Sequence, residues 1–317
     1  MYMLLLSVLH VVLRVASGSH HETIETLMPN VLVLNVDLKD FIERDVDLSC
    51  GDAYQDPDIT WMKSGRRVGV GNKITVKVEE MLAGNYSCHG RDGVYLNHTL
   101  VLVQDRQPHG GPRRILESHD KDKIEYIRCF ARNYSGVFHC SWKKNVHWTS
   151  ASVILVQAAR FSGSNISCYV DGDGAGMICQ DLDSCPFGEE VSRINLTVYF
   201  RKNYLLEEYT TTPFLIREIV RPDRVHSIEV NGDKFHWKAP MTWSSPCSYF
   251  PLLFQVKAVD CGESCDSDRE VIMKAVTMNH TFDILSYEDR YRFCIQAKDE
   301  LVDSPWSQWA YFELNEE

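Results

Sequence analysis

Two tryptophans near the end of the chain, Trp306 and Trp309, constrain the fold more than any other feature of the sequence. In an extended, polyproline-like segment both lie on one face, because such a helix has about three residues per turn. Their rings can then sandwich basic side chains from a neighbouring strand, each contact contributing roughly 0.5–1 kcal/mol at exposed sites. The strand at 290–298 offers such partners, since alternation turns Arg292 and Lys298 outward. The pattern therefore predicts a β-sheet module that binds other proteins, and its box consists of Trp306, Ser307, Gln308, Trp309, Ala310 and Arg292.

The length and the strand pattern indicate an all-β chain of several domains. At 317 residues the chain is too long for one sandwich and fits about three domains of roughly 100 residues. Apolar and polar residues alternate in short runs that glycine, asparagine, aspartate and proline interrupt, which is typical of strands. Examples are Val46–Cys50, Lys73–Val78, Ile194–Phe200 and Leu252–Val259. The formal net charge of −11 disfavours nucleic acid as a partner.

The start of the chain and its sequons indicate a secreted, extracellular glycoprotein. Met1–Val15 is mostly apolar and precedes the small residues Ala16 and Gly18, so we expect a signal peptide over residues 1–18. Eleven cysteines fit an oxidising compartment. No later apolar run approaches the roughly 20 residues that a membrane span needs, so we expect no membrane insertion. Candidate glycosylation sites are Asn85, Asn97, Asn133, Asn165, Asn195 and Asn279.

The first domain, residues 19–105, has the residue order of an immunoglobulin-like sandwich. Cys50 and Cys88 flank Trp61, which in such a sandwich packs on the disulfide between the sheets. Tyr86 stands two residues before the second cysteine, where a tyrosine corner needs it. These residues predict a Cys50–Cys88 disulfide.

The second domain, residues 106–218, begins with a linker rich in proline and glycine. Two cysteine pairs, Cys129 with Cys140 and Cys168 with Cys179, each enclose ten residues. A disulfide that closes so small a loop contributes roughly 3 kcal/mol in the chain-entropy model. We therefore predict two hairpin-bridging disulfides in a fibronectin type III module.

The third domain, residues 219–317, is predicted to be a second fibronectin type III module. Its boundary contains Pro222, which fixes the backbone between domains. The segment at 235–240 carries Trp237 and Pro240, the strand signature of this module. The tryptophan box completes it.

The remaining cysteines are odd in number, so at least one thiol is free or intermolecular. They are Cys185, Cys247, Cys261, Cys265 and Cys294. Three connectivities are open among the last four, and we favour Cys261–Cys265 slightly, as a local clip. Alternation along its strand predicts that Cys294 faces outward.

No pattern of catalysis or cofactor binding occurs in the sequence. It contains no G-x-S-x-G, no H-E-x-x-H and no P-loop. The glycine run at 172–176 is not followed by a helical pattern, so it is a turn and not a phosphate cradle. Asp171 and Asp173 begin like a calcium loop, but Ala175 and Leu182 occupy later ligand positions. We expect no catalytic residue, no cofactor and no metal, and hence no enzyme.

Several segments, in the same order along most of the mature chain, resemble one cytokine family. The chain resembles the beta-subunit family shared by interleukin-12 and interleukin-23, a soluble branch of the type I cytokine receptors, in a fish-like version. The tryptophan box resembles the W-S-x-W-S box of cytokine-receptor modules, with Ala310 in the last place. The other matching segments are residues 129–142, 213–223 and 242–250.

This resemblance implies a partner and a binding surface. The family holds a four-helix-bundle alpha subunit at the elbow of the second and third domains, and the pair signals to T and natural killer cells through a cell-surface receptor chain. Cys185 matches the position that forms the interchain disulfide. At least one of the adjacent aromatics Tyr249 and Phe250 should pack in the core of its own module. A carboxylate at the centre of the surface can accept a bidentate arginine from the partner. The implied partner-binding residues are Tyr134, Glu189, Tyr249, Phe250 and Asp299.

Two alternatives stay open at this point. A freestanding soluble cytokine receptor would use the same elbow without needing a reactive Cys185, and a homodimer through Cys185 could act as an antagonist. The family has tyrosines directly after the aspartate that corresponds to Asp299, and this chain has Glu300 and Leu301 there, at the rim of the binding surface. The sequence also leaves open which alpha subunit binds and which residues of the first domain contact a receptor.

Overall fold

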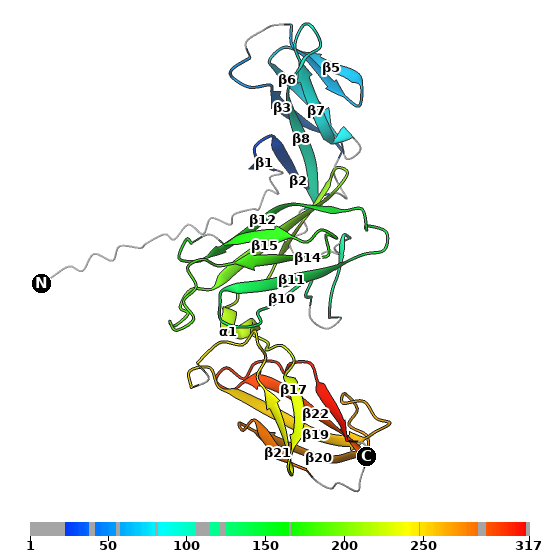
Figure 1. The fold of residues 1–317 in the computed structure, drawn as a ribbon. Coiled ribbons are helices and arrows are strands. Elements are labelled where there is room, and N and C mark those ends of the chain that lie inside the picture. Colours follow the sequence, from blue (N-terminus) through cyan, green and yellow to red (C-terminus); the bar gives the residue numbers. More distant parts are fainter. Residues whose placement is uncertain are drawn as a thin grey trace, which may run out of the picture. The chain divides into compact units, whose positions relative to one another are not determined.

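A computed structural model describes residues 23–37, 42–54, 58–79, 82–105, 114–120, 124–164, 166–246, 248–284 and 290–314. The predicted signal peptide, the linker at 106–112, Asn165 and Cys247 lie outside these residues. The chain divides into two compact units, residues 1–109 and 110–317. Both consist almost entirely of strands, so the prediction of an all-β chain is confirmed (Figure 1). Within the described part, no helix is both long and apolar enough to cross a membrane.

The first unit has two sheets that enclose a disulfide. In one sheet the order is β1-β2-β8-β7-β4-β5, with β2 and β8 parallel, and the other pairs β3 with β6. Cys50 and Cys88 are bonded, and Trp61 is fully buried with them. The Tyr86 hydroxyl donates to the Leu82 carbonyl at 2.7 Å, which is the hydrogen bond of a tyrosine corner. The strands are β1 (Thr23–Met28), β2 (Val31–Val36), β3 (Arg44–Ser49), β4 (Thr60–Lys63), β5 (Arg66–Val70), β6 (Lys73–Val78), β7 (Gly84–His89) and β8 (Tyr95–Asp105).

The second unit begins with a module of two sheets. One sheet has the order β10-β11-β14-β13, with β9 also pairing β11, and the other includes β12-β15-β16. Cys129 lies opposite Cys140 and Cys168 opposite Cys179 across antiparallel strands, and both pairs are bonded. The elements are β9 (Leu116–Glu117), β10 (Ile127–Phe130), β11 (Val137–Lys144), β12 (Ser152–Arg160), β13 (Ser167–Val170), β14 (Gly176–Gln180), β15 (Ile194–Lys202), β16 (Leu205–Thr210) and the short helix α1 (Ile216–Ile219).

The second unit ends with another module of two sheets. Their orders are β17-β18-β21 and β20-β19-β22-β23. The strands are β17 (His226–Asn231), β18 (Lys234–Lys238), β19 (Leu252–Asp260), β20 (Val271–Thr277), β21 (Thr281–Asp283), β22 (Tyr291–Asp299) and β23 (Ala310–Leu314).

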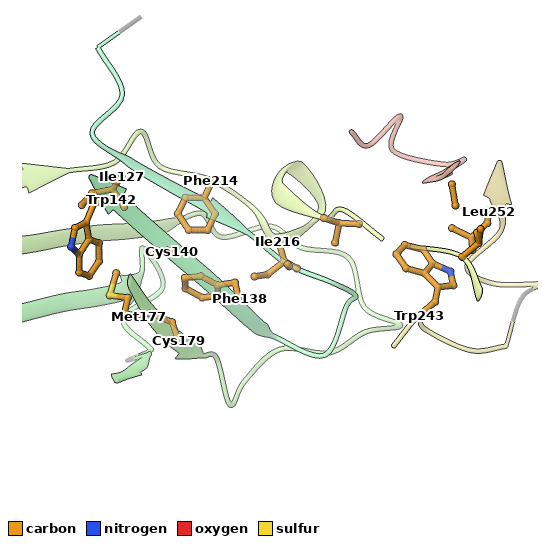
Figure 2. Packing of buried hydrophobic residues seen from close by; sticks show 14 of the residues in the cluster. Ile127, Phe138, Cys140, Trp142, Met177, Cys179, Phe214, Ile216, Trp243 and Leu252 are labelled. Atoms are coloured by element: carbon orange, nitrogen blue, oxygen red, sulfur yellow. The ribbon is translucent and has the colours of Figure 1, made fainter. Parts of the chain in front are cut away.

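One continuous hydrophobic core runs through both modules of the second unit. Figure 2 follows it from Trp142 and Phe138 past Ile216 of α1 to Trp243 and Leu252. Because a single core spans the connection, α1 is a packed element and not a loose linker.

The prediction of a local disulfide between Cys261 and Cys265 is wrong. Cys265 is instead bonded to Cys294, with 5.8 Å between their Cα atoms. Cys294 does lie off the main core, as alternation predicts, but it is completely buried beside Val259 and Trp309. The loop at 261–270 folds over the outer face of the sheet and brings Cys265 there. The spacing of the cysteines in the sequence does not show that this loop folds back over the sheet.

The tryptophan box forms three cation–aromatic pairs, and only one of them follows the prediction. Lys298 lies over Trp306 at 5.0 Å from the ring centre, as alternation indicated. Trp309 pairs at 5.7 Å with Lys257 of β19 and not with Arg292. Arg292 lies 4.9 Å from the centre of the Tyr311 ring and forms an ion pair with Glu313 at 2.7 Å. The disulfide of Cys294 occupies the place between Arg292 and Gln296 on that face, which explains the changed partner.

Candidate partner-binding site

A small pocket in the second unit collects the residues that the sequence singled out. It is a cavity of about 120 Å³, and its walls come from five segments that are far apart along the chain. Loops after β10 and β14 form one part, α1 another, and loops before β19 and after β22 the rest. The predicted residues among its lining are Tyr134, Cys185, Glu189, Tyr249, Phe250 and Asp299.

Hydrogen bonds between the modules fix Tyr134 in the pocket. The backbone N–H of Tyr134 donates to the Ser244 hydroxyl at 3.1 Å. The preceding Asn133 donates its Nδ2 to the Thr242 carbonyl at 2.5 Å and accepts from the Ser135 N–H at 3.0 Å. The tyrosine is therefore held from both sides of the connection.

Asp299 forms the floor of the pocket and is completely buried. Its Oδ2 accepts the Tyr134 hydroxyl at 2.9 Å, and its Oδ1 accepts the N–H groups of Leu301 and Val302 at 2.8 and 3.2 Å. Burial is the main cause that raises the pKa of Tyr134, and the charge and hydrogen bond of Asp299 raise it further. Tyr134 thus stays a protonated donor at neutral pH. Both Asp299 oxygens already accept hydrogen bonds within the chain, whereas Glu189 is exposed.

The tryptophan box and Ser304 just before it hold the strand end that carries Asp299. The Ser304 hydroxyl accepts the N–H of Asp299 at 2.9 Å, and the Ser307 hydroxyl accepts the N–H of Ala297 at 2.9 Å. Ser304, Ser307 and Ala310 recur every third residue and are all buried. Ser304, two residues before the box, therefore holds Asp299 directly, and Ser307 of the box holds the same strand two residues earlier.

Aromatic rings cluster beside the pocket, and the sequence revealed only part of this cluster. Phe250 is 4% exposed and belongs to the core, whereas Tyr249 is 45% exposed. Phe187 was missed: its ring centre lies 5.1 Å from that of Tyr249 and 5.6 Å from that of Phe250. The Tyr249 hydroxyl also donates to the Phe187 carbonyl at 2.8 Å. Phe187 lies two residues after the candidate interchain cysteine, Cys185, and this position is the sequence feature that could have indicated it.

Cys185 is an exposed free thiol on the loop at 181–190, which is anchored at both ends. The Arg160 guanidinium forms an ion pair with Asp181 at 2.5 Å and lies 3.5 Å from Glu190. Asp181 is fully buried, and Arg160 donates a further bond to the Ser192 carbonyl at 2.7 Å. The loop that presents the thiol thus has a defined position. Cys261 is the other free thiol in the described part of the chain.

The helix α1 supplies two lining residues that the sequence did not indicate, Ile216 and Arg217. Glu190 accepts the backbone N–H groups of both, each at 2.9 Å, so the thiol-bearing loop and the helix are joined. Nothing in the local pattern of residues 213–220 distinguishes Arg217 from an ordinary surface arginine.

The fold and the site define a class of protein. Paired β-sandwich modules share one core, a tryptophan box stacks on basic side chains, and loops at the connection form an aromatic pocket with an exposed thiol. These are the features of a cytokine-receptor-like binding chain.

Comparison with known proteins gives the family. A family model described as cytokine interleukin-12p40 C-terminus matches residues 124–202. Interleukin-12 subunit beta of Mesocricetus auratus is 30% identical over 306 residues, which cover 89% of this chain and 90% of the relative. The proteins of that name from Macaca mulatta and Homo sapiens are each 29% identical over 289 residues, covering 84% of this chain and 85% of each relative. The chain belongs to the interleukin-12 subunit beta family; it is a cytokine subunit and not an enzyme.

Proposed function

We propose that the chain is the secreted beta subunit of a heterodimeric cytokine and binds a four-helix-bundle alpha subunit at the pocket. The observation that carries this proposal is the convergence of Tyr134, Glu189, Tyr249, Phe250 and Asp299 around one cavity beside a free thiol. Rigid aromatic rings are the anchors that protein interfaces favour. Partly exposed Tyr249 and Phe187 offer such area to a helix.

Cys185 forms the interchain disulfide in this proposal. Its thiolate attacks a partner cysteine that carries a mixed disulfide with glutathione. The new sulfur–sulfur bond forms, and glutathione leaves as a thiolate that takes up the proton lost from Cys185. The anchored loop and the exposure of the thiol support this role.

The assembled pair engages a cell-surface receptor chain and signals to T and natural killer cells. Glycans belong at Asn85, Asn195 and Asn279, whose side chains are exposed. The Nδ2 atoms of Asn97 and Asn133 instead donate to the carbonyls of Cys50 and Thr242, so these two are structural. The family membership and the predicted signal peptide support an extracellular location.

Co-expression with candidate helical alpha subunits tests the proposal. The secreted medium is run on reducing and non-reducing gels, for the parent chain, Cys185→Ser and, as a matched control, Cys261→Ser. We expect a heterodimer band that reduction removes, that Cys185→Ser abolishes and that Cys261→Ser retains. A monomer in every pairing, with a titratable thiol, would favour a freestanding receptor. A covalent dimer of the chain alone would favour the homodimeric antagonist.

A further inference from the structure

Arg217 is a cation in the pocket that has no ionic partner within the described residues. It lies in α1, is half-buried and lines the cavity beside Ile216. Neighbouring arginines differ: Arg160 is paired with Asp181, and Arg193 with Glu218 at 2.7 Å. The guanidinium of Arg217 is therefore the unused donor of this site.

The nearby carboxylates are already engaged by other donors. Glu190 accepts two backbone N–H groups of α1 and lies beside Arg160. Asp299 accepts Tyr134 and two backbone N–H groups. Glu218 is held by both guanidinium nitrogens of Arg193, each at 2.7 Å. Among the described residues no carboxylate forms an ion pair with Arg217, so its donors are available to an acceptor from a partner.

The surroundings of Arg217 favour such an acceptor. Arg217 and Tyr134 both line the cavity, and the charge of Arg217 lowers the pKa of Tyr134 against the larger raising effects of burial and Asp299. Ile216, Phe250 and Leu301 give the cavity apolar walls. A guanidinium presents donors in a planar fork that fits a carboxylate bidentately, and partial removal from water strengthens such bonds.

We propose that Arg217 determines specificity at the pocket by binding a carboxylate of the incoming helical subunit. The pocket thereby selects a helix that presents an aspartate or glutamate at this point. This inference rests on the proposed function and adds the chemistry of the partner to it.

The test measures affinity without the covalent link. Cys185→Ser is the parent, and its binding to the co-expressed alpha subunit is compared with Arg217→Glu, Arg217→Gln and Arg217→Lys in the same background. Arg269→Glu, an exposed arginine outside the pocket, is the matched control for the charge change. We expect Arg217→Glu to weaken binding at least about 30-fold, Arg217→Gln less, and Arg217→Lys least, because lysine keeps the charge but not the fork. Arg269→Glu should bind like the parent.

A charge swap identifies the partner residue. Each acidic residue on the alpha subunit's binding helix is changed to lysine, and one such change should restore binding to Arg217→Glu. Equal affinity of Arg217→Glu, Arg217→Gln and parent, with unchanged circular dichroism, would overturn this inference alone. A parent that binds no helical subunit would instead overturn the proposed function, and this inference with it.

Discussion

Gly136 shows how one absent side chain shapes the pocket. Its φ is +82°, and an added Cβ would lie 2.5 Å from the Ser184 Cβ and 2.6 Å from the Asp181 carbonyl oxygen. Its own carbonyl accepts the Asp181 N–H at 3.0 Å. The glycine therefore lets the loop that carries Cys185 approach the turn that precedes β11.

Gly136→Ala should lower the free energy of unfolding by about 3–4 kcal/mol, since backbone strain and overpacking add. Gly163→Ala is the control, because its φ is +96° but nothing lies within 4 Å of the added Cβ. Strain alone should cost about 1–2 kcal/mol there. Urea unfolding of both variants measures the difference, and equal losses would show that the close approach is unimportant.

His139 should make stability depend on pH. Burial lowers its pKa below the ordinary 6.5, and Arg132 adds to this, while Asp171 and Asp223 act in the opposite direction. Because the folded-state pKa is the lower one, the unfolded chain takes up the proton first. The contribution of His139 is therefore intact above pH 6.5 and is lost progressively as the pH falls from that value to the lower folded-state pKa.

The comparison is between the chain and His139→Gln, unfolded in urea at about pH 7.5 and about pH 5. The variant should lose less stability between the two conditions, because the carboxylates that titrate are common to both proteins. An equal loss would mean that protonation of His139 is not linked to folding.

At the scale of elements, the loop at 181–190 depends on a buried ion pair. The side chains of Arg160 and Asp181 are 10% and 0% exposed. Arg160→Gln leaves the Asp181 charge buried without its partner, so the free energy of unfolding should fall by about 3–5 kcal/mol. Binding of the alpha subunit should weaken as well, because the same arginine lies beside Glu190, which holds α1.

Arg193→Gln is the matched control, since its pair with Glu218 is 45% and 41% exposed and its loss should matter much less. Chemical unfolding of the two variants compares their losses in the free energy of unfolding. If Arg160→Gln were as stable as Arg193→Gln, the loop would be held mainly by Phe187 and its aromatic neighbours.

Contacts along one strand could be predicted from the sequence, whereas contacts made by a loop that folds over a sheet could not. Strand alternation correctly placed Lys298 against Trp306, because this contact joins residues that are close in sequence. The partner of Cys294 and the contact of Lys257 with Trp309 depend on a loop that returns over a sheet.

Contacts between segments that are distant in sequence also limited the prediction of the pocket. Its aromatic and acidic residues came from family resemblance, whereas Phe187 and Arg217 escaped notice. Both lie outside the strands, on a loop and on a short helix, so no periodic pattern marks their side chains. The packing of α1 brings Arg217 to the cavity, and the loop at 181–190 brings Phe187 against Tyr249 beside it.

At the scale of the whole molecule, all parts of the proposed binding site belong to one unit. The pocket, Cys185 and the tryptophan box lie within residues 110–317, and the continuous core spans both modules of that unit. A cut at the module boundary near residue 219 would expose part of this core, whereas the first unit has its own disulfide and buried tryptophan.

A fragment of residues 110–317 should therefore unfold in one cooperative transition and bind the alpha subunit as the full chain does, including the reducible link through Cys185. The two modules expressed separately, divided near residue 219, should lose stability, because each would expose apolar surface worth roughly 25 cal/mol per Å². Thermal unfolding followed by circular dichroism and co-expression gels measure both properties. A folded fragment that failed to capture an alpha subunit bound by the full chain would show that the first unit takes part in the interface. The pocket alone would then be an incomplete site.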